Sequence, residues 1–402
     1  MAALGFTHSL LRADSGEEAH RVTFVELFFD LVFVFAITQL SHLLIEDPSL
    51  DSHLHTIMIT LAVWWVWVYT TWAANWLDPQ RGWVRTMLIA LMLLGLLMSG
   101  AIPEAFGEKG LLFAAAFVLM QVGRSVFTAF AFAPHQRASA LNFARISFWL
   151  VASGVFWIWG GLVPPGERVW LWSIALVLEY LGPIARFRVP FLGYSDPETW
   201  RVSGSHFAER VSLFFIIALG ESVIVTGSAF SREPLDWLHL AAFLAAFTGT
   251  VLMWLLYFNH GERGGSEYIR QASSSGLVAR LAYTYIPVVM VVGIVLTAVG
   301  DELVLDDPLG EHGGTTAGNA LVICSASAIY LLGNVLFKRA VGASWLVSHF
   351  VGIAVLGGFF LLHPVLAPLA LTWLANAVML GVVLADELAF RRERAQEELL
   401  PE

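Results

Sequence analysis

Charged side chains are scarce in this sequence. Asp, Glu, Lys and Arg make up 13% of the residues, against about 25% in soluble domains, while 57% are hydrophobic. A chain this apolar is predicted to be an integral membrane protein. Its formal net charge of −10 is not that of a nucleic-acid-binding protein, so no nucleic-acid partner is expected.

Several features of soluble enzymes are also missing. Cys324 is the one cysteine, which excludes an intramolecular disulfide. Neither a glycine-rich phosphate loop nor a Gly-x-Ser-x-Gly nucleophile elbow occurs, and no residue stands out as a nucleophile. We therefore expect no enzymatic activity and no bound cofactor. The first 23 residues are of mixed polarity and do not resemble a cleavable signal sequence.

The hydrophobic residues occur in runs of about 20, the length that crosses a ~30 Å hydrocarbon core as a helix. Backbone groups must be hydrogen-bonded inside lipid, so long uninterrupted runs predict helices and not a barrel. The sequence therefore predicts an all-α polytopic membrane protein with about twelve transmembrane helices, at residues 24–45, 54–74, 83–101, 110–132, 141–162, 168–186, 206–230, 236–260, 278–300, 317–338, 343–363 and 366–390.

Positive charge predicts the orientation of these helices. With a cytoplasmic N-terminus, seventeen of the 22 Lys and Arg residues lie on the cytoplasmic side and three on the other side. Arg124 and Arg210 lie inside spans. The outward loops are acidic, as at residues 45–51 and 301–307. Both termini are therefore predicted to be cytoplasmic.

The span positions divide the chain into two halves of six helices, residues 24–186 and 206–390. Residues 187–205 are a predicted cytoplasmic linker. Residues 1–23 and 391–402 form the N-terminal segment and the tail. A second connector, residues 261–277, is rich in Gly and Ser and is predicted to be a surface loop.

Two short matches favour an internal repeat of the halves. The triplet FVE at residues 24–26 matches FAE at residues 207–209, and VGRSVF at 122–127 matches LGNVLF at 332–337. Two parallel six-helix repeats would be related by an axis along the membrane normal, with a central site between them.

Acidic residues inside the spans are the strongest functional signal. Glu26, Asp30 and Glu221 lie in apolar segments, where a carboxylate costs a few kcal/mol to insert and is read as functional by default. Glu26 and Asp30 are four residues apart and share one helix face, about 6 Å apart along the axis. Arg210 and Glu221 are almost three turns apart and also share a face.

The deep charges comprise five acids and two arginines, namely Glu26, Asp30, Glu179, Glu209, Glu221, Arg124 and Arg210. This acidic excess must be protonated or must bind a cation. Most of these residues lie in the inner third of their spans, and Glu221 lies nearest the midplane. We expect a polar vestibule open to the cytoplasm with Glu221 at its closed end. We also expect an ion pair between one arginine and one of the acids.

Structural interpretations compete with this one. Glu26 and Glu209 also suit first-turn residues that complement a helix N-terminal dipole. Arg124 and Glu179 also suit a buried structural pair. His206 and Glu209 have the spacing of a metal-binding pair on a helix, but two residues do not make a site, and no metal is predicted.

Two segments resemble the bacterial low temperature requirement A family. They are VELFFDLVFVFAITQLSH at residues 25–42 and HFAERVSLFFIIALGES at residues 206–222. The resemblance covers nearly the whole chain and implies a polytopic protein of the bacterial cytoplasmic (inner) membrane, linked by name to growth in the cold. It implies six hallmark positions, Glu26, Asp30, His206, Glu209, Arg210 and Glu221. Residues 28–38 are also similar to the first helix of lysosomal-type potassium channels, although Phe29 replaces their serine.

Together these observations favour a proton-coupled secondary transporter of unknown substrate. Asp30, Glu221 and Glu26 are the predicted proton- or ion-coupling residues. The predicted charge network around them comprises Glu209, Arg210, His206, Arg124 and Glu179. The alternatives are a cation channel, and a non-catalytic membrane sensor or assembly factor in cold adaptation. Expected partners are the lipid bilayer, protons or a small cation, and an unknown small molecule. A homo-oligomer is compatible with the sequence.

The charge distribution makes a testable prediction about topology. Reporter domains fused after Glu402 and inserted in the loop near Asp306 should report opposite sides of the membrane, because an odd number of spans separates them in the twelve-span arrangement. Protease protection or alkaline phosphatase activity measures the side. The same side for both reporters would contradict the arrangement.

Overall fold

The computed structural model describes most of the chain, and its regular elements are helices. The described residues are 9–12, 21–46, 50–196, 200, 202–259, 261–272, 275–310 and 313–397. Besides the helices, these residues contain two isolated β-bridges, Leu11 with Leu77 and Val189 with Gly193. The predicted all-α class is confirmed.

Within the described residues, ten helical segments are long and apolar enough to cross a membrane. Each coincides with a predicted span. They are α1 (Phe24–Glu46), α2 (Leu50–Trp76), α3 (Gly82–Gly100), α4 (Gly110–Phe132), α5 (Arg137–Leu162), α7 (Gly204–Phe230), α8 (Trp237–Phe258), the run of α10 (Ser275–Arg280), η4 (Leu281–Tyr285) and α11 (Pro287–Asp306), then α12 (Ala317–Ala340) and α14 (Pro368–Glu397). The protein is a multi-pass membrane protein.

The two other predicted spans are helices that are less apolar or shorter than these ten. Residues 168–186 correspond to α6 (Pro165–Ile184), which contains three charged residues, Glu167, Arg168 and Glu179. Residues 343–363 correspond to α13 (Val347–Leu361), which has 15 residues, fewer than the roughly 20 that cross a bilayer. The count of twelve spans therefore stays a prediction.

One predicted loop is wrong. Part of the Gly/Ser-rich connector at 261–277 forms a helix, α9 (Gly261–Gln271). Its Gly265 lies against two aromatic side chains, since a Cβ there would be 2.7 Å from Tyr283 Oη and 2.9 Å from Phe337 Cζ. The glycine is needed for close packing here, whereas the Gly/Ser content of the segment suggests a flexible loop.

The chain forms two compact units. Unit 1 comprises residues 1–214 and 269–280, and unit 2 comprises residues 215–268 and 281–402. Helix α7 contributes residues to both. The predicted division into halves at 24–186 and 206–390, with its linker and tails, stays a prediction.

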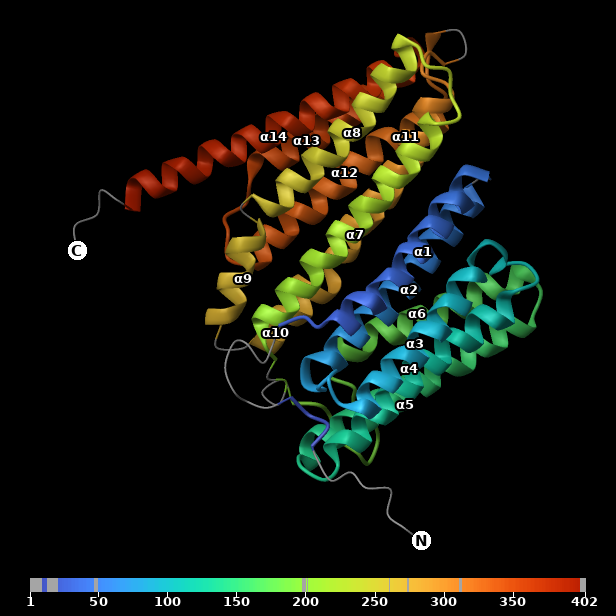
Figure 1. Cartoon of the computed structure of the whole chain (residues 1–402), viewed down its shortest axis with the longest axis vertical. Coiled ribbons are helices and arrows are strands. Elements are labelled where there is room, and N and C mark those ends of the chain that lie inside the picture. Colours follow the sequence, from blue (N-terminus) through green and yellow to red (C-terminus); the bar gives the residue numbers. More distant parts are fainter. Residues whose placement is uncertain are drawn as a thin grey trace. The chain divides into compact units, whose positions relative to one another are not determined.

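Helix α2 is the central helix of unit 1. In its most apolar stretch 89% of the residues are buried, against 39% in the corresponding stretches of α3 and α5. It packs against α1, α4 and α6, while α3, α4 and α5 run side by side (Figure 1). Trp64, Trp65 and Trp67 of α2 are almost completely buried. The tryptophan cluster therefore belongs to the core and does not anchor the helix at the membrane interface.

Unit 2 is built around α11 and α12. These helices approach closely at two glycines, since a Cβ on Gly293 would be 2.9 Å from Tyr330 Cβ, and one on Gly333 would be 2.6 Å from Met290 Cγ. Small residues at helix contacts are typical of membrane bundles, where apolar burial does not favour helix contact over lipid contact. Helices α8 and α14 pack against this pair, and α13 packs against α12 and α14.

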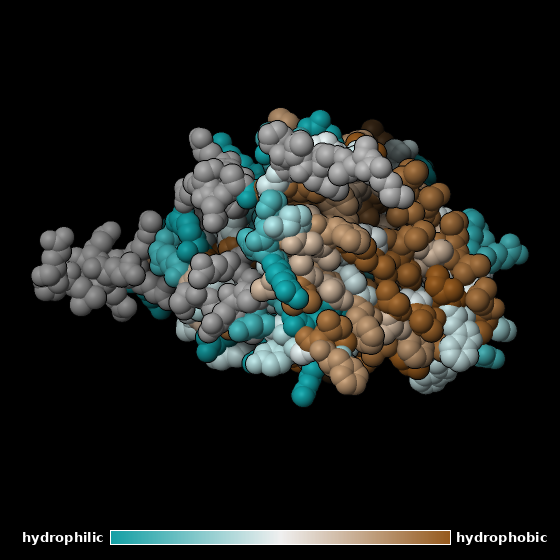
Figure 2. All heavy atoms as spheres, turned by 90° about the horizontal axis from the view of Figure 1, so that it is seen from below, coloured by the Kyte–Doolittle hydropathy of each residue, from teal (hydrophilic) through white to brown (hydrophobic). Residues whose placement is uncertain are grey.

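Large apolar side chains cover the outward faces of many helices. On α3, for example, Leu93, Leu96 and Leu97 are 44–61% exposed. Figure 2 shows broad apolar areas next to hydrophilic ones in one view of the molecule. Such surface suits contact with lipid chains.

The close contact in unit 2 predicts the effect of a single methyl group. Gly333→Ala should destabilise the protein by about 1–3 kcal/mol, because the added Cβ overlaps the Met290 backbone and side chain. Gly318→Ala in the same helix is the matched control, since nothing lies within 4 Å of that Cβ position. Unfolding in mixed micelles measures both, and equal behaviour of the two variants would contradict the packing described.

Candidate functional site

The start of α1 explains the position of Glu26. Thr23 precedes the helix, and its backbone N–H and its hydroxyl both donate to Glu26 Oε2 at 2.8 Å. A threonine followed three residues later by glutamate is a capping pattern, which satisfies N–H groups that the first helical turn leaves free. The structural interpretation of Glu26 as a first-turn residue therefore holds.

Glu26 also binds two cationic or polar partners from distant sequence. The Arg12 Nη2 group lies 3.2 Å from both carboxylate oxygens, and His206 Nε2 lies 2.8 Å from Oε1. The Glu26 and His206 side chains are almost completely buried. The carboxylate thus receives a full set of hydrogen bonds.

Asn75 of α2 orients His206. The Asn75 side-chain NH₂ lies 3.2 Å from His206 Nδ1 and also donates to the Ser203 carbonyl, while its oxygen accepts from the Ser203 N–H at 2.9 Å. With Nδ1 accepting from Asn75, Nε2 carries the hydrogen that is donated to Glu26. The contact ties the start of α7 to α2 and α1.

One turn along α1, Asp30 forms a second buried pair. Its Oδ1 accepts from Arg210 Nη2 at 2.7 Å and from Trp67 Nε1 at 2.8 Å. The exposed fractions of the Asp30 and Arg210 side chains are 0% and 1%. The Arg210 guanidinium also lies 5.6 Å from the Trp67 ring centroid, a cation–π arrangement. The predicted ion pair between an arginine and a deep acid is present.

Half of this pair is not hydrogen-bonded. Among the described residues, Asp30 Oδ2 and Arg210 Nε and Nη1 are buried without a hydrogen-bond partner. An unsatisfied buried polar group costs about 1–3 kcal/mol, and more when it is charged. An acceptor and two donors are therefore available for water or a polar group of a ligand, and the acceptor oxygen can also take up a proton.

Glu209 differs from its neighbours on α7. Its side chain is exposed and accepts a hydrogen bond from the Val22 backbone N–H at 3.2 Å. His206 and Glu209 thus have different environments, the first buried against Glu26 and the second outside. This arrangement offers no support for a metal pair.

Arg124 and Glu179 form a separate network in unit 1. They are linked through Gln121, whose NH₂ donates to Glu179 at 2.7 Å and whose oxygen accepts from Arg124. Ser153 also donates to Glu179 at 3.0 Å. The guanidinium donates in addition to α2, at the Val66 carbonyl and the Thr70 hydroxyl. Every one of these groups is buried and bonded, which suits the structural interpretation.

In unit 2, the structure corrects the assignment of Asp301. Sequence reasoning placed it in an acidic outward loop at 301–307, but α11 continues to Asp306, and Asp301 and Glu302 are each 5% exposed. Glu302 pairs with Arg232 at 2.5 Å, and Asp301 accepts hydrogen bonds from Ser222 and Thr226. The ion pair neutralises Glu302, whereas Asp301 has only the two hydroxyl donors. The first helix breaker comes at Pro308.

Glu221 of α7 is 2% exposed, next to Ser222. It belongs to unit 2, whereas Glu26, Asp30 and Arg210 belong to unit 1. The predicted vestibule that joins all of them stays a prediction.

Sequence reasoning missed the residues that hold the predicted ones in place. Arg12 lies before the first span, and Asn75 and Trp67 belong to α2 and were not connected to a partner. Asn75 lies one residue beyond the predicted span 54–74, so nothing in the sequence singled it out, and the structure extends α2 to Trp76. Nothing in the local sequence of Arg12 indicates its contact.

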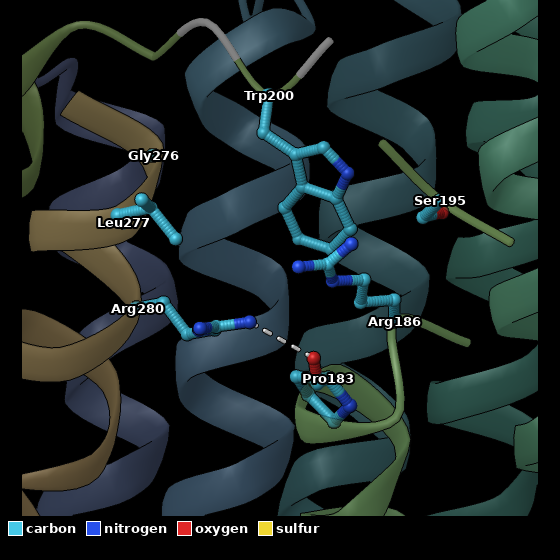
Figure 3. A pocket seen from close by; sticks show the side chains of 7 residues that line it. All are labelled: Pro183, Arg186, Ser195, Trp200, Gly276, Leu277 and Arg280. Atoms are coloured by element: carbon cyan, nitrogen blue, oxygen red, sulfur yellow. Dashed lines mark hydrogen bonds between the residues drawn. The ribbon is translucent and has the colours of Figure 1, made fainter. Parts of the chain in front are cut away.

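A small pocket in unit 1 contains none of the predicted site residues. It has a volume of about 20 Å³ and is lined by Pro183, Arg186, Ser195, Trp200, Gly276, Leu277 and Arg280. Arg186 and Arg280 extend into it, and Arg280 Nη1 donates to the Pro183 carbonyl at 3.0 Å (Figure 3). Its size limits it to about one water molecule or one anionic oxygen.

Comparison with known proteins identifies the family of the chain. The family model described as "Bacterial low temperature requirement A protein (LtrA)" matches residues 21–384, which include both buried pairs on α1. The chain belongs to this family. The family assignment thus confirms the resemblance of the α1 and α7 segments.

A relative that aligns over nearly its whole length supports the family assignment. The chain is 39% identical to "Uncharacterized protein RA0937" of Rhizobium meliloti (strain 1021) over 394 residues, which cover 96% of this chain and 94% of the relative. No solved structure matches the chain.

The Asp30–Arg210 pair predicts a non-additive effect on stability. Asp30→Asn or Arg210→Gln alone should each cost about 3–5 kcal/mol, because each leaves an uncompensated buried charge. The double variant should cost less than the sum of the two. Unfolding of purified protein in micelles gives the coupling energy.

An exposed pair serves as the control for this cycle. Arg81 lies 3.1 Å from Asp78, and their side chains are 43% and 25% exposed. The same neutralisations there should change stability by at most about 1 kcal/mol. Strict additivity at Asp30 and Arg210 would show that the two side chains do not interact in the membrane.

Proposed function

We propose that this member of the low temperature requirement A family is a proton-coupled secondary transporter of a small molecule. The observation that carries the proposal is the buried Asp30–Arg210 pair, of which Asp30 Oδ2 and Arg210 Nε and Nη1 lack partners among the described residues. A partly satisfied ion pair is a poor stabiliser, because desolvation costs more than the attraction returns. Such a pair is better suited to exchanging a proton or binding a polar group.

The proposal gives each residue of unit 1 a role. Asp30 takes up and releases the proton, and Arg210 is its charge partner or the contact for an anionic substrate group. Glu26, one turn away, is the third coupling residue, and its contact with His206 offers a second group that can exchange a proton. Arg124, Glu179 and Glu209 hold the surrounding charge network.

Glu221 is the second proposed coupling residue. It is buried in α7, within an apolar span, where a permanently charged carboxylate is costly. The proposal assigns it the protonated state for part of the working cycle.

The proposal includes a location and a topology. The protein resides in the bacterial inner membrane with both termini in the cytoplasm, and it crosses the membrane twelve times, with α6 and α13 as the two additional spans. A role in the response to cold and a homo-oligomeric state are further parts of the proposal. We do not propose enzymatic activity.

The two proposed six-helix repeats have support from a shared contact. Arg124 and Asn334 occupy matching positions in the VGRSVF and LGNVLF segments. Arg124 of α4 donates to the Val66 carbonyl of α2, and Asn334 of α12 donates to the Leu256 carbonyl of α8, each at 3.2 Å. The fourth predicted span of each half thus donates to a carbonyl of the second.

A second candidate is a membrane sensor or assembly factor without transport activity. The complete hydrogen bonding of Glu26 and of Glu179 favours it, because such groups stabilise helix contacts without a ligand. A cation channel is the third candidate, and flux measurements separate the three. Saturable flux driven by a pH gradient indicates a transporter, unsaturable cation flux a channel, and no flux a sensor.

Neutral substitutions of the coupling acids test the leading proposal. Glu221→Gln keeps the shape of the protonated side chain, so the protein should insert and fold, while proton-coupled transport is lost. Asp30→Asn should reduce function and change its dependence on pH. The measurements are growth of a complemented deletion strain at low temperature and several pH values, and acidification of everted vesicles on addition of amino acids, sugars or organic acids.

Glu167→Gln is the control, because Glu167 is an exposed acid at the start of α6 that belongs to neither charge network. It should complement as well as the wild type. Full complementation by Glu221→Gln and Asp30→Asn across pH and temperature would overturn the transporter proposal in favour of the sensor or assembly factor.

A further inference from the structure

Asp301 is a buried carboxylate in unit 2 that the proposed transport mechanism does not use. The Ser222 and Thr226 hydroxyls of α7 donate to its Oδ2 at 3.2 and 3.3 Å. Its Oδ1 receives no hydrogen bond from the described residues, and Asp301 forms no ion pair with any of them. A carboxylate in this state has to hold a proton or a cation.

A cavity adjoins Asp301. It has a volume of about 30 Å³, room for one small ion or one to two water molecules. Helices α8, α11, α12 and α14, which pack against one another in unit 2 (Figure 1), enclose it. Its polar lining residues are Asp301, Thr297, Ser327, Thr372 and Asn376.

Asn376 presents an oxygen to this cavity. Its side-chain NH₂ donates to the Ala245 carbonyl at 2.8 Å, which fixes the orientation of the amide and leaves Oδ1 as an acceptor. A Cβ on Gly249, another lining residue, would lie 3.0 Å from this oxygen. Glycine at 249 therefore leaves the space that the Asn376 oxygen occupies.

The hydroxyl groups around the cavity also offer acceptors. Thr297 and Thr372 donate to carbonyls of their own helices, at Gly293 and Pro368, so their oxygen lone pairs remain for another group. Ser327 has no hydrogen-bond partner among the described residues. No described Lys, Arg or His lines the cavity. The lining is thus rich in oxygen acceptors and suits a cation, not an anion.

The charge of the lining and the size of the cavity select the kind of cation. Oxygen ligands are those of hard cations. One carboxylate neutralises a monovalent ion, whereas a divalent ion would leave an uncompensated positive charge within a membrane span. The cavity volume of about 30 Å³ favours a small ion over a large one.

We propose that unit 2 contains a sodium site, in which Asp301, Asn376 and Ser327 bind the ion and Ser222 and Thr226 orient the carboxylate. The site does not depend on proton-coupled transport through unit 1. It also gives Gly249 and the buried end of α11 a function.

A direct binding experiment tests for the sodium site. Purified full-length protein in detergent, at fixed pH and with choline chloride keeping ionic strength constant, should bind radioactive ²²Na⁺ saturably. Asp301→Asn should weaken binding at least about tenfold. Gly249→Ala, which keeps the carboxylate and displaces the Asn376 oxygen, should weaken it as well, and so should Ser327→Ala.

Asp306→Asn is the control, because Asp306 is an exposed acid five residues further along α11. It should bind ²²Na⁺ as the wild type does. If Asp301→Asn fails to fold, the Gly249→Ala and Ser327→Ala variants decide. Absence of saturable binding in the wild type, equal competition by K⁺, or unchanged affinity in all three site variants would overturn the proposal. The binding assay measures no transport, so it can succeed or fail independently of the proposed transport function.

Discussion

Charge within a membrane span must find its partners within the protein, and in unit 1 α2 contributes polar contacts to every buried charge network. Trp67 donates to Asp30, Asn75 orients His206, and the Val66 carbonyl and Thr70 hydroxyl accept from Arg124. Both charge networks are thus attached to one buried helix. Because α2 is surrounded by protein, its polar groups avoid lipid and still serve residues of α1, α4 and α7.

The buried carboxylates of unit 1 differ in how completely they are hydrogen-bonded. Glu26 and Glu179 receive hydrogen bonds on both carboxylate oxygens, and groups of that kind fix helices in place. The Asp30–Arg210 pair, only one turn from Glu26, retains free donors and an acceptor among the described residues. The contrast separates the part of the site that builds the fold from the part available for chemistry.

Much of the fold could be predicted from the sequence, since a span has a fixed length and its ends are marked by polar or helix-breaking residues. All twelve predicted segments coincide with helices in position. The buried acids were also visible, because a carboxylate in an apolar run is unusual. The partner of each buried charge was harder to predict. The sequence indicated an ion pair between an arginine and one of several acids, but not that Arg210 pairs with Asp30.

Asp301 and α9 show where the sequence argument fails. Four acids in seven residues at 301–307 resemble a solvated loop, yet two of them are buried. Hydroxyls of α7 donate to Asp301, and the Arg232 guanidinium pairs with Glu302. The glycines of α9 resemble a linker, yet Gly265 packs against aromatic rings. In both cases the groups that stabilise the segment belong to other helices, so its own composition does not indicate them.

The separation of Asp30 and Arg210 along the chain, 180 residues, has a consequence for biogenesis. At roughly 5–20 residues per second, about 9–36 s pass between synthesis of the acid and of its base. Arg12 precedes Glu26 and is available from the start, and Trp67 follows Asp30 closely. For that interval the newly inserted first helix holds its deeper acid without a base, so protonation or delayed entry into lipid has to protect it until α7 is made.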